Sequence, residues 1–271
     1  MVRNAGDRTA AGAVLTGSAP GHDPALERAE GRAISAIYAG LPHGWVREVG
    51  GWAVRSWPQR PDSIWMHQAF AEGPVTGSSL DRALAGLDGL PVNVQVPAGG
   101  LADAELLSRG LGSPVRLVRF VGDPALLGGA APAPHPDLLV ETVGPPGGGH
   151  VSAVARAAFG FDEPWWWTAP LGAPGWTQLV AYAAHEPVAT AALHQVGEVA
   201  WLGAAGTVPD ARGRGAQTAL LRHRLALAAE LGATRIAAKA APGSVSERNL
   251  LRAGFVQAYD IVQWSRPALS P

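Results

Sequence analysis

The sequence has 271 residues, of which 47% are hydrophobic and 16% are charged, so the chain can fold as one large domain or as two of ordinary size. Its net charge is −1, and no dense Lys/Arg run occurs, which argues against nucleic acid as a partner. There is no cysteine, which excludes disulfide scaffolds, thiolate zinc sites and cysteine nucleophiles.

The chain shows no signal for membrane insertion or export. Residues 1–24 contain no continuous apolar segment of signal-peptide length, and no apolar run approaches the roughly 18 residues of a membrane span. We therefore expect a cytoplasmic protein with no membrane partner. Residues 1–24 are rich in Ala, Gly, Ser, Thr and Pro without periodicity, and we interpret them as a flexible leader.

Residues 25–125 form the first predicted unit, which mixes helices and strands. Apolar periodicity and turn residues define its elements. Helices are predicted at 25–41, 78–89 and 103–109, and strands at 51–57, 63–70, 91–97 and 114–121.

Residues 126–137 are rich in alanine, glycine and proline and are predicted to be a linker to a second unit, residues 138–268. Strands are expected at 137–143, 177–184, 187–197, 198–208, 235–241 and 255–264, and helices at 150–160, 214–231 and 245–253. The pattern predicts an α/β fold with helices around a mixed sheet.

The segment "TVPDARGRGAQTALLRHRLALAAELG", residues 207–232, carries the clearest chemical signal. Two arginines and two glycines stand directly before a helix, where exposed backbone amides and the helix dipole favour a phosphate group. The segment lacks both the G-x-G-x-x-G dinucleotide motif and the G-x-x-x-x-G-K-[ST] motif of P-loops.

This segment resembles the acyl-CoA loop of the GNAT superfamily of N-acyltransferases, in which a strand ending in V-x-P precedes [RQ]-x-x-G-x-[GA] and a long helix. Arg212 and Gly215 match the first two motif positions, whereas Gln217 replaces the usual Gly or Ala, and Thr207 replaces a valine. The resemblance extends over residues 199–241 and to Asn249 and "AGF" in the last helix. It implies a complete GNAT domain at 138–268 and a degenerate GNAT-like domain at 25–125, as in tandem members.

The resemblance implies that the chain binds acetyl-CoA or another short acyl-CoA. Backbone amides of the loop and helix start would contact the pyrophosphate, with arginine side chains adding charge. Free backbone groups of the preceding strand would pair with pantetheine. The predicted cofactor-binding residues are Ala205, Thr207, Arg212, Gly213, Arg214, Gly215, Ala216, Gln217 and Asn249.

Acyl transfer to an amine needs a base and an acid. Leu250 occupies the position where family members often carry a tyrosine that acts as the general acid. Tyr259 or Tyr182 is the alternative acid, and His194 or Glu198 is the nearest candidate base; each also suits a structural role.

The tryptophan-rich segment "FDEPWWWTAPLGAPGW", residues 161–176, lies where GNAT domains commonly bind the acceptor. Trp165, Trp166 and Trp167 can form an aromatic wall and Asp162 and Glu163 can hold an ammonium group, or the segment can instead plug the core between the two units. The eight histidines show no metal-binding spacing, so no metal is predicted.

We therefore predict an acyl-CoA-dependent N-acetyltransferase that acts on the amine of a small molecule. The alternatives are a non-catalytic protein that binds acyl-CoA or another small ligand, and a thioester enzyme for O-acylation or decarboxylation. The fold analogy selects neither an acceptor nor an oligomeric state.

Overall fold

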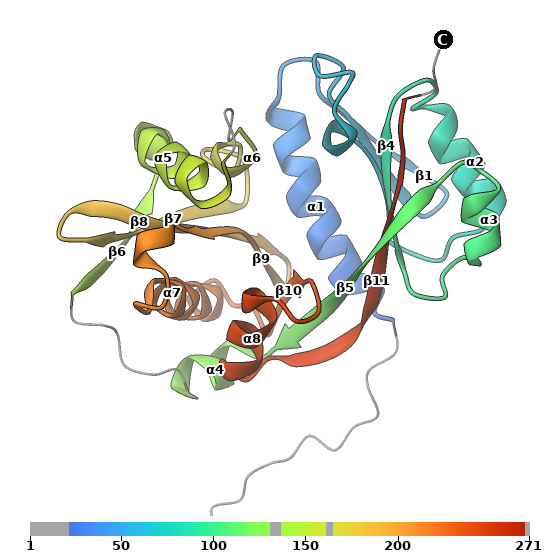
Figure 1. Cartoon of the computed structure of the whole chain (residues 1–271). Coiled ribbons are helices and arrows are strands. Elements are labelled where there is room, and N and C mark those ends of the chain that lie inside the picture. Colours follow the sequence, from blue (N-terminus) through green and yellow to red (C-terminus); the bar gives the residue numbers. More distant parts are fainter. Residues whose placement is uncertain (1–21, 131–136, 161–164, 269–271) are drawn as a thin grey trace, which may run out of the picture.

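Short apolar segments separated by glycine-containing turns form one eleven-stranded mixed sheet in the computed structural model, which describes residues 22–130, 137–160 and 165–268. Helices cover both faces of this sheet (Figure 1). The predicted α/β class with a mixed sheet is thus confirmed.

The first half of the chain contributes five strands and four helices. Its elements are α1 (Pro24–Gly40), β1 (Trp45–Val49), β2 (Trp52–Ser56), a 3-10 turn (Ile64–Met66), β3 (His67–Ala71), α2 (Gly77–Ala85), β4 (Val92–Pro97), α3 (Asp103–Leu107), β5 (Gly112–Gly122) and α4 (Pro124–Ala130). The sequence analysis missed β1, and α4 covers residues 126–130 of the predicted linker, 126–137.

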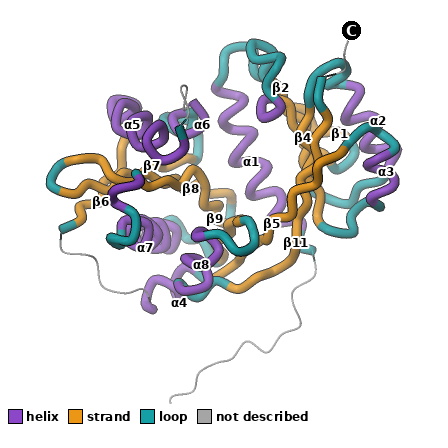
Figure 2. The backbone as a smooth tube through the Cα atoms, in the orientation of Figure 1, coloured by secondary structure: helices purple, strands orange, loops and turns teal. Residues whose placement is uncertain are grey.

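The second half contributes the remaining six strands. Its elements are β6 (Leu138–Val143), a 3-10 turn (Pro145–Gly147), α5 (Gly148–Phe159), α6 (Trp165–Thr168), β7 (Trp176–Ala183), β8 (Glu186–Val196), β9 (Val199–Thr207), a 3-10 turn (Pro209–Ala211), α7 (Ala216–Glu230), β10 (Arg235–Ala240), α8 (Val245–Arg252) and β11 (Val256–Arg266). Figure 2 shows α5 and α6 on one side of the strands, and α7 and α8 on the other.

The two halves exchange their last strands. The strand order is β1-β2-β3-β4-β11-β5-β10-β9-β8-β7-β6, so β11 lies beside β4 of the first half and β5 lies beside β10 of the second. Trp264 of β11 packs in the core of the first half, and Phe120 of β5 packs in the core of the second. Each half therefore completes its core with a strand from the other.

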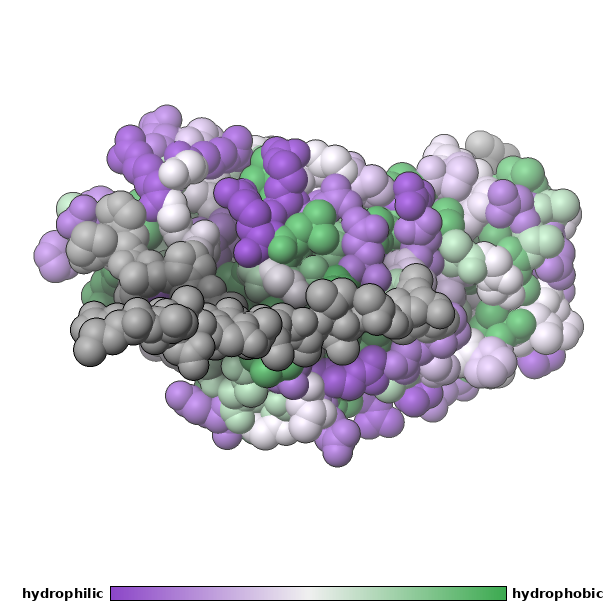
Figure 3. Space-filling view, turned by 90° about the horizontal axis from the view of Figure 1, so that it is seen from below, coloured by the Kyte–Doolittle hydropathy of each residue, from purple (hydrophilic) through white to green (hydrophobic). Residues whose placement is uncertain are grey.

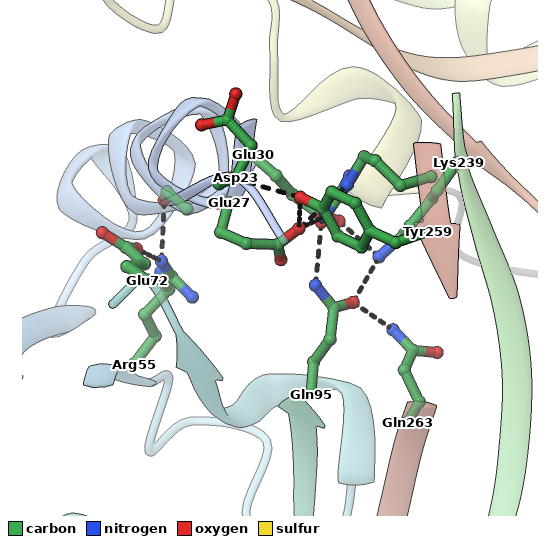
Figure 4. A network of polar contacts seen from close by, with 11 residues as sticks. Asp23, Glu27, Glu30, Arg55, Glu72, Gln95, Lys239, Tyr259 and Gln263 are labelled. Atoms are coloured by element: carbon green, nitrogen blue, oxygen red, sulfur yellow. Dashed lines mark hydrogen bonds and ion pairs between the residues drawn. The ribbon is translucent and has the colours of Figure 1, made fainter. Parts of the chain in front are cut away.

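Helix α1 joins the halves from one face of the sheet, where it contacts β1 and β2 as well as β8 and β9. The polar network of Figure 4 lies beneath it. Arg119 of β5 donates hydrogen bonds to Glu27 and Glu30 of α1, at 2.7 Å from Nη2 to each. Lys239 of β10 pairs with Glu30, and the Tyr259 hydroxyl on β11 donates to Glu27. Helix α1 and strands β5, β10 and β11 thus contribute side chains to one polar network at the junction.

None of the helices in the described part of the chain is both long and apolar enough to cross a membrane. Seen from below, the surface carries hydrophilic and hydrophobic residues interspersed (Figure 3).

Candidate functional site

A cleft of about 1780 Å³ runs from the start of α7 to the junction of the two halves. Its lining is drawn from α1, the 3-10 turn before β3, α6, β9, the loop after β9, α7, β10 and α8. Both halves therefore contribute to a single site.

Strand β9 separates from β10 within this cleft. The two strands pair only where Val199, Ala200 and Trp201 face Arg235, Ile236 and Ala237, although β9 continues to Thr207. The segment 202–207 thus leaves its β10-facing backbone groups free of that strand, and residues 202–207 all line the cleft. Such an edge can pair with an extended amide-containing ligand.

A β-bulge shapes the same segment. The pairing of β8 with β9 shifts register between Thr190 and Ala192, which face Gly206 and Gly203. Ala204, inside the shift, has a φ of 47°, which is rare for a residue with a Cβ. The bulge bends β9 and increases its divergence from β10.

The start of α7 faces the cleft with unsatisfied backbone donors. Gly215 is the N-cap residue with a φ of 83°, and no side chain caps the helix. Gly213 also has a positive φ, of 76°, and a Cβ there would meet no atom within 4 Å. The glycines thus allow the turn and leave it open, and the amides of the first helical turn remain available to an anion.

Two side chains of the loop fix it to its neighbours. Gln217 Nε2 donates to Gly206 O at 2.9 Å and to Thr207 Oγ1 at 2.8 Å. Arg212 Nη2 donates to Ala158 O of α5 at 3.1 Å. Gln217, which departs from the usual small residue, therefore turns toward β9 and ties the helix start to the bulged strand.

The tryptophans of α6 line the opposite part of the cleft and contact aromatic side chains of the first half. Trp165 lies 5.5 Å from Trp57 between ring centroids, and Trp166 lies 6.4 Å from Tyr38. The three tryptophans of α6 are half-buried and line the cleft. Trp165 and Trp166 therefore contact the first half across the junction and also line the cleft.

Arg224 is the unexpected member of the lining. It lies on α7, is only 5% exposed and lines the cleft. Burial lowers its pKa to about 10, and no charged group contributes to that shift. A protonated guanidinium therefore lies at the cleft wall without a carboxylate partner in the described structure.

Comparisons with known proteins agree with this geometry. Residues 153–255 match the Acetyltransferase (GNAT) family. The C-terminal half of the chain belongs to the GNAT family. No curated protein matches the sequence.

The whole chain has the fold of tandem GNAT proteins. A GCN5-related N-acetyltransferase from Kribbella flavida has a TM-score of 0.67 at 16% identity, covering 90% of this chain and 95% of that one. A tandem GNAT protein from the clavulanic acid biosynthesis pathway has a TM-score of 0.55 at 13% identity, covering 93% and 98%. A GCN5-related N-acetyltransferase from Sphaerobacter thermophilus has a TM-score of 0.55 at 15% identity, covering 93% and 96%.

Most of the residues predicted to bind the cofactor lie together at this cleft. The residues that line it are Ala205, Thr207, Arg212, Gly213, Gly215, Ala216, Gln217 and Asn249. Arg214 is exposed in the same GNAT loop but is not part of the lining. Asp162 and Glu163, predicted to hold an ammonium group, lie outside the described residues.

The predicted acid and base candidates lie outside the cleft lining. His194 is 5% exposed and packs 5.2 Å from Trp176 between ring centroids, and burial lowers its pKa to about 4. Glu198 is exposed at the β8–β9 turn. Burial and Glu27 raise the pKa of Tyr259, whose hydroxyl is engaged with Glu27. Tyr182 bonds to His150 at the far side of the sheet.

Sequence reasoning missed the lining residues of the first half, Lys239 of β10 and Arg224 of α7. Glu30 and Lys239 line the cleft as an ion pair; although burial opposes it, Lys239 and Arg119 lower the pKa of Glu30 to about 2. Arg224 had a signal, because it stands four residues from both Leu220 and Ala228 in the apolar stripe of α7. Within the described residues, no group of three His, Cys, Asp or Glu side chains could hold a metal ion.

Proposed function

We propose that the chain is an acyl-CoA-dependent N-acyltransferase, with acetyl-CoA as the simplest donor and the amine of a small molecule as acceptor. The observation that carries the proposal is the divergence of β9 from β10 directly beside the open start of α7. One end of this arrangement suits a pyrophosphate and the other suits an amide-containing arm.

The residues that would hold the donor follow from this geometry. The first-turn amides of α7 and the backbone at Gly213 would bind the pyrophosphate, and the exposed Arg214 would add charge. The free backbone edge of 202–207 would pair with the pantetheine amides. Acyl-CoA supplies the acyl group as a thioester: the amine nitrogen forms the new C–N bond as the C–S bond breaks, and the proton lost by the amine is balanced by the one gained by the thiol.

The cleft between the halves is the proposed acceptor site. The tryptophans of α6 offer flat apolar surfaces, which attract apolar or cationic groups. Glu30 is the lining carboxylate among the described residues, and Lys239 and Arg119 already neutralise it. An amine that enters uncharged needs only weak base assistance, whereas an alcohol requires a strong base. The lining thus favours an amine acceptor over an alcohol.

A non-catalytic role as an acyl-CoA-binding protein is the second candidate. It is favoured by Leu250, which is buried at the position where many GNAT members carry a tyrosine as the general acid. The two roles share the binding site and differ in turnover. Thiol release from acetyl-CoA with a panel of small amines separates them: binding without release across the panel would assign the non-catalytic role.

Calorimetric titration with acetyl-CoA and free CoA tests the binding site. We expect a micromolar Kd, roughly −8 kcal/mol, and loss of binding in the double variant Arg212→Ala, Gly215→Glu. The variant removes an arginine that fixes the loop and places a carboxylate at the phosphate position.

A matched control carries the same two changes away from the loop. Arg156→Ala with Gly149→Glu alters exposed residues of α5, where a side chain at Gly149 meets no atom within 4 Å. Circular dichroism would establish that both variants are folded. Unchanged CoA affinity in the folded loop variant would contradict the proposed site.

A further inference from the structure

Arg224 is a buried cation that the described structure leaves without an anion. Its Nε and Nη1 contact the backbone carbonyls of Leu220 and Ala192 only at 3.4 and 3.5 Å, which is the long limit for a hydrogen bond. Within the described residues, Nη2 makes no hydrogen bond. A buried charge is normally paired, because removing it from water is costly. Arg224 is therefore suited to an anionic ligand that the cleft admits.

The position of Arg224 identifies which part of a ligand it can reach. It follows the first residue of α7 by eight positions, which places it about 12 Å along the helix axis from the proposed pyrophosphate site. That distance is a large part of the length of an extended pantetheine arm. The guanidinium thus lies toward the acyl end of a bound donor rather than beside its phosphates.

Arg224 and the tryptophans of α6 are carried by helices on opposite sides of the sheet, which assigns Arg224 to the donor rather than to the acceptor. Leu202 of β9 packs with Leu221 and Leu225 of α7, whereas the neighbouring Trp201 packs against α1. Arg224 is carried by α7 and contacts Ala192 O of β8 from that side, whereas α6, the helix of the three tryptophans, lies on the opposite side of the strands (Figure 1). Arg224 lines the same cleft as the free edge of residues 202–207, so a group bound along that edge can extend toward it.

We propose that Arg224 forms a carboxylate subsite, and that the preferred donor is an acyl-CoA whose acyl chain ends in a carboxylate. This inference rests on the proposed function and specifies its donor class. Guanidinium suits the role because its planar set of donors matches the two oxygens of a carboxylate. Leu202, Leu221, Ala238 and Leu250 line the same cleft, and their apolar side chains suit the methylene groups of such a chain.

The test compares two donors of equal chain length. Succinyl-CoA and butyryl-CoA both carry four-carbon acyl groups, and only the first ends in a carboxylate. Calorimetry on the wild-type protein should give an affinity about ten- to a hundredfold higher for succinyl-CoA, the range expected for hydrogen bonds to a charged group. The same comparison in Arg224→Met should remove this preference while free CoA binds as before.

Two further variants test whether the preference for succinyl-CoA depends on position 224 and on the guanidinium group. Arg222→Met removes a half-exposed arginine of the same helix outside the cleft lining, and it should retain the succinyl preference. Arg224→Lys keeps the charge but not the two-pronged geometry, and it should retain part of the preference.

Each outcome separates this inference from the proposed function. Equal affinity of wild type for both donors would overturn the carboxylate subsite while leaving acyl-CoA binding intact. Failure of every CoA derivative to bind would overturn the proposed function itself. A change confined to the KM of the acceptor in Arg224→Met would assign the carboxylate to the acceptor and so overturn the donor assignment.

Discussion

At the scale of single residues, His194 shows how burial decides what a titratable group can do. The ring is held between Trp176 and the turn at Gly175, where an added Cβ would lie 2.7 Å from Nε2. Its Nδ1 has no hydrogen-bond partner in the described residues. A ring with a pKa of about 4 is neutral at pH 7, so it contributes packing rather than charge to the folded protein.

This depressed pKa predicts a loss of stability in mild acid. The unfolded chain binds a proton at His194 near pH 6.5 while the folded chain does so only near pH 4, so stability is full above about 6.5 and falls as the pH falls toward 4. The loss is at most about 3 kcal/mol. Urea unfolding at pH 7.5 and 4.5 should show a larger difference for wild type than for His194→Gln; equal differences would contradict the buried neutral ring.

The residues of the site differ in how far the sequence could predict them. Arg212 and Gly215 were identifiable because the loop is a short continuous segment. Its glycines, Gly213 and Gly215, adopt positive φ angles that the turn requires. The role of His194 depends on which way one strand position faces, and periodicity within β8 alone does not set that direction. Arg224 was detectable only as a charge within an apolar helical stripe, since what it faces comes from β8, β9 and β10 together.

At the scale of elements, the bulge of β9 links local strain to the opening of the cleft. Ala204 holds a left-handed φ of 47°, and the register shift that it creates bends the strand away from β10. The neighbouring Ala205 is exposed in the same strand and has no positive φ. These two adjacent alanines therefore differ in backbone conformation while sharing an element.

A pair of valine substitutions tests the bulge. A β-branched residue is strongly disfavoured at a positive φ but is favoured in ordinary strand conformation. Ala204→Val should lower the free energy of unfolding by about 1–3 kcal/mol and weaken CoA binding, whereas Ala205→Val should leave stability nearly unchanged. Chemical denaturation of both variants provides the measurement, and similar losses in the two would argue against a strained bulge.

Elements with strong local signals were predicted and weaker ones were missed. The helix of residues 214–231 was predicted because its apolar stripe and C-terminal glycine act within one segment. The hairpin of β1 and β2 was missed although Gly50 and Gly51, both at positive φ, form its two-residue turn. The order of the strands was beyond prediction, because the partner of a strand depends on residues far away in the chain.

At the scale of the whole molecule, the exchanged strands make the halves depend on each other. Removal of β11 would leave β4 and β5 without the strand between them, and removal of β5 would do the same to β10 and β11. The Arg119 network adds a buried electrostatic link between α1 and three strands of the junction. The cleft is lined by residues of this junction, among them Glu30 and Lys239, so its shape requires both halves to be folded.

Two arginines of β5 provide the test of this coupling. Arg119 is fully buried between Glu27 and Glu30, whereas Arg116 pairs with Asp260 at the surface. Arg119→Met should destabilise the protein by about 3–5 kcal/mol, because it leaves two buried carboxylates short of a partner. Arg116→Met should change stability little, since water replaces an exposed ion pair readily.

The unfolding curves should also show how the halves are connected. Because each half contributes a strand to the core of the other, tryptophan fluorescence and far-ultraviolet circular dichroism should report one coincident transition for wild type and both variants. Arg119→Met should move that single transition to lower denaturant rather than split it. Two separate transitions in wild type would show that the halves unfold independently, and the exchanged strands would then not couple them.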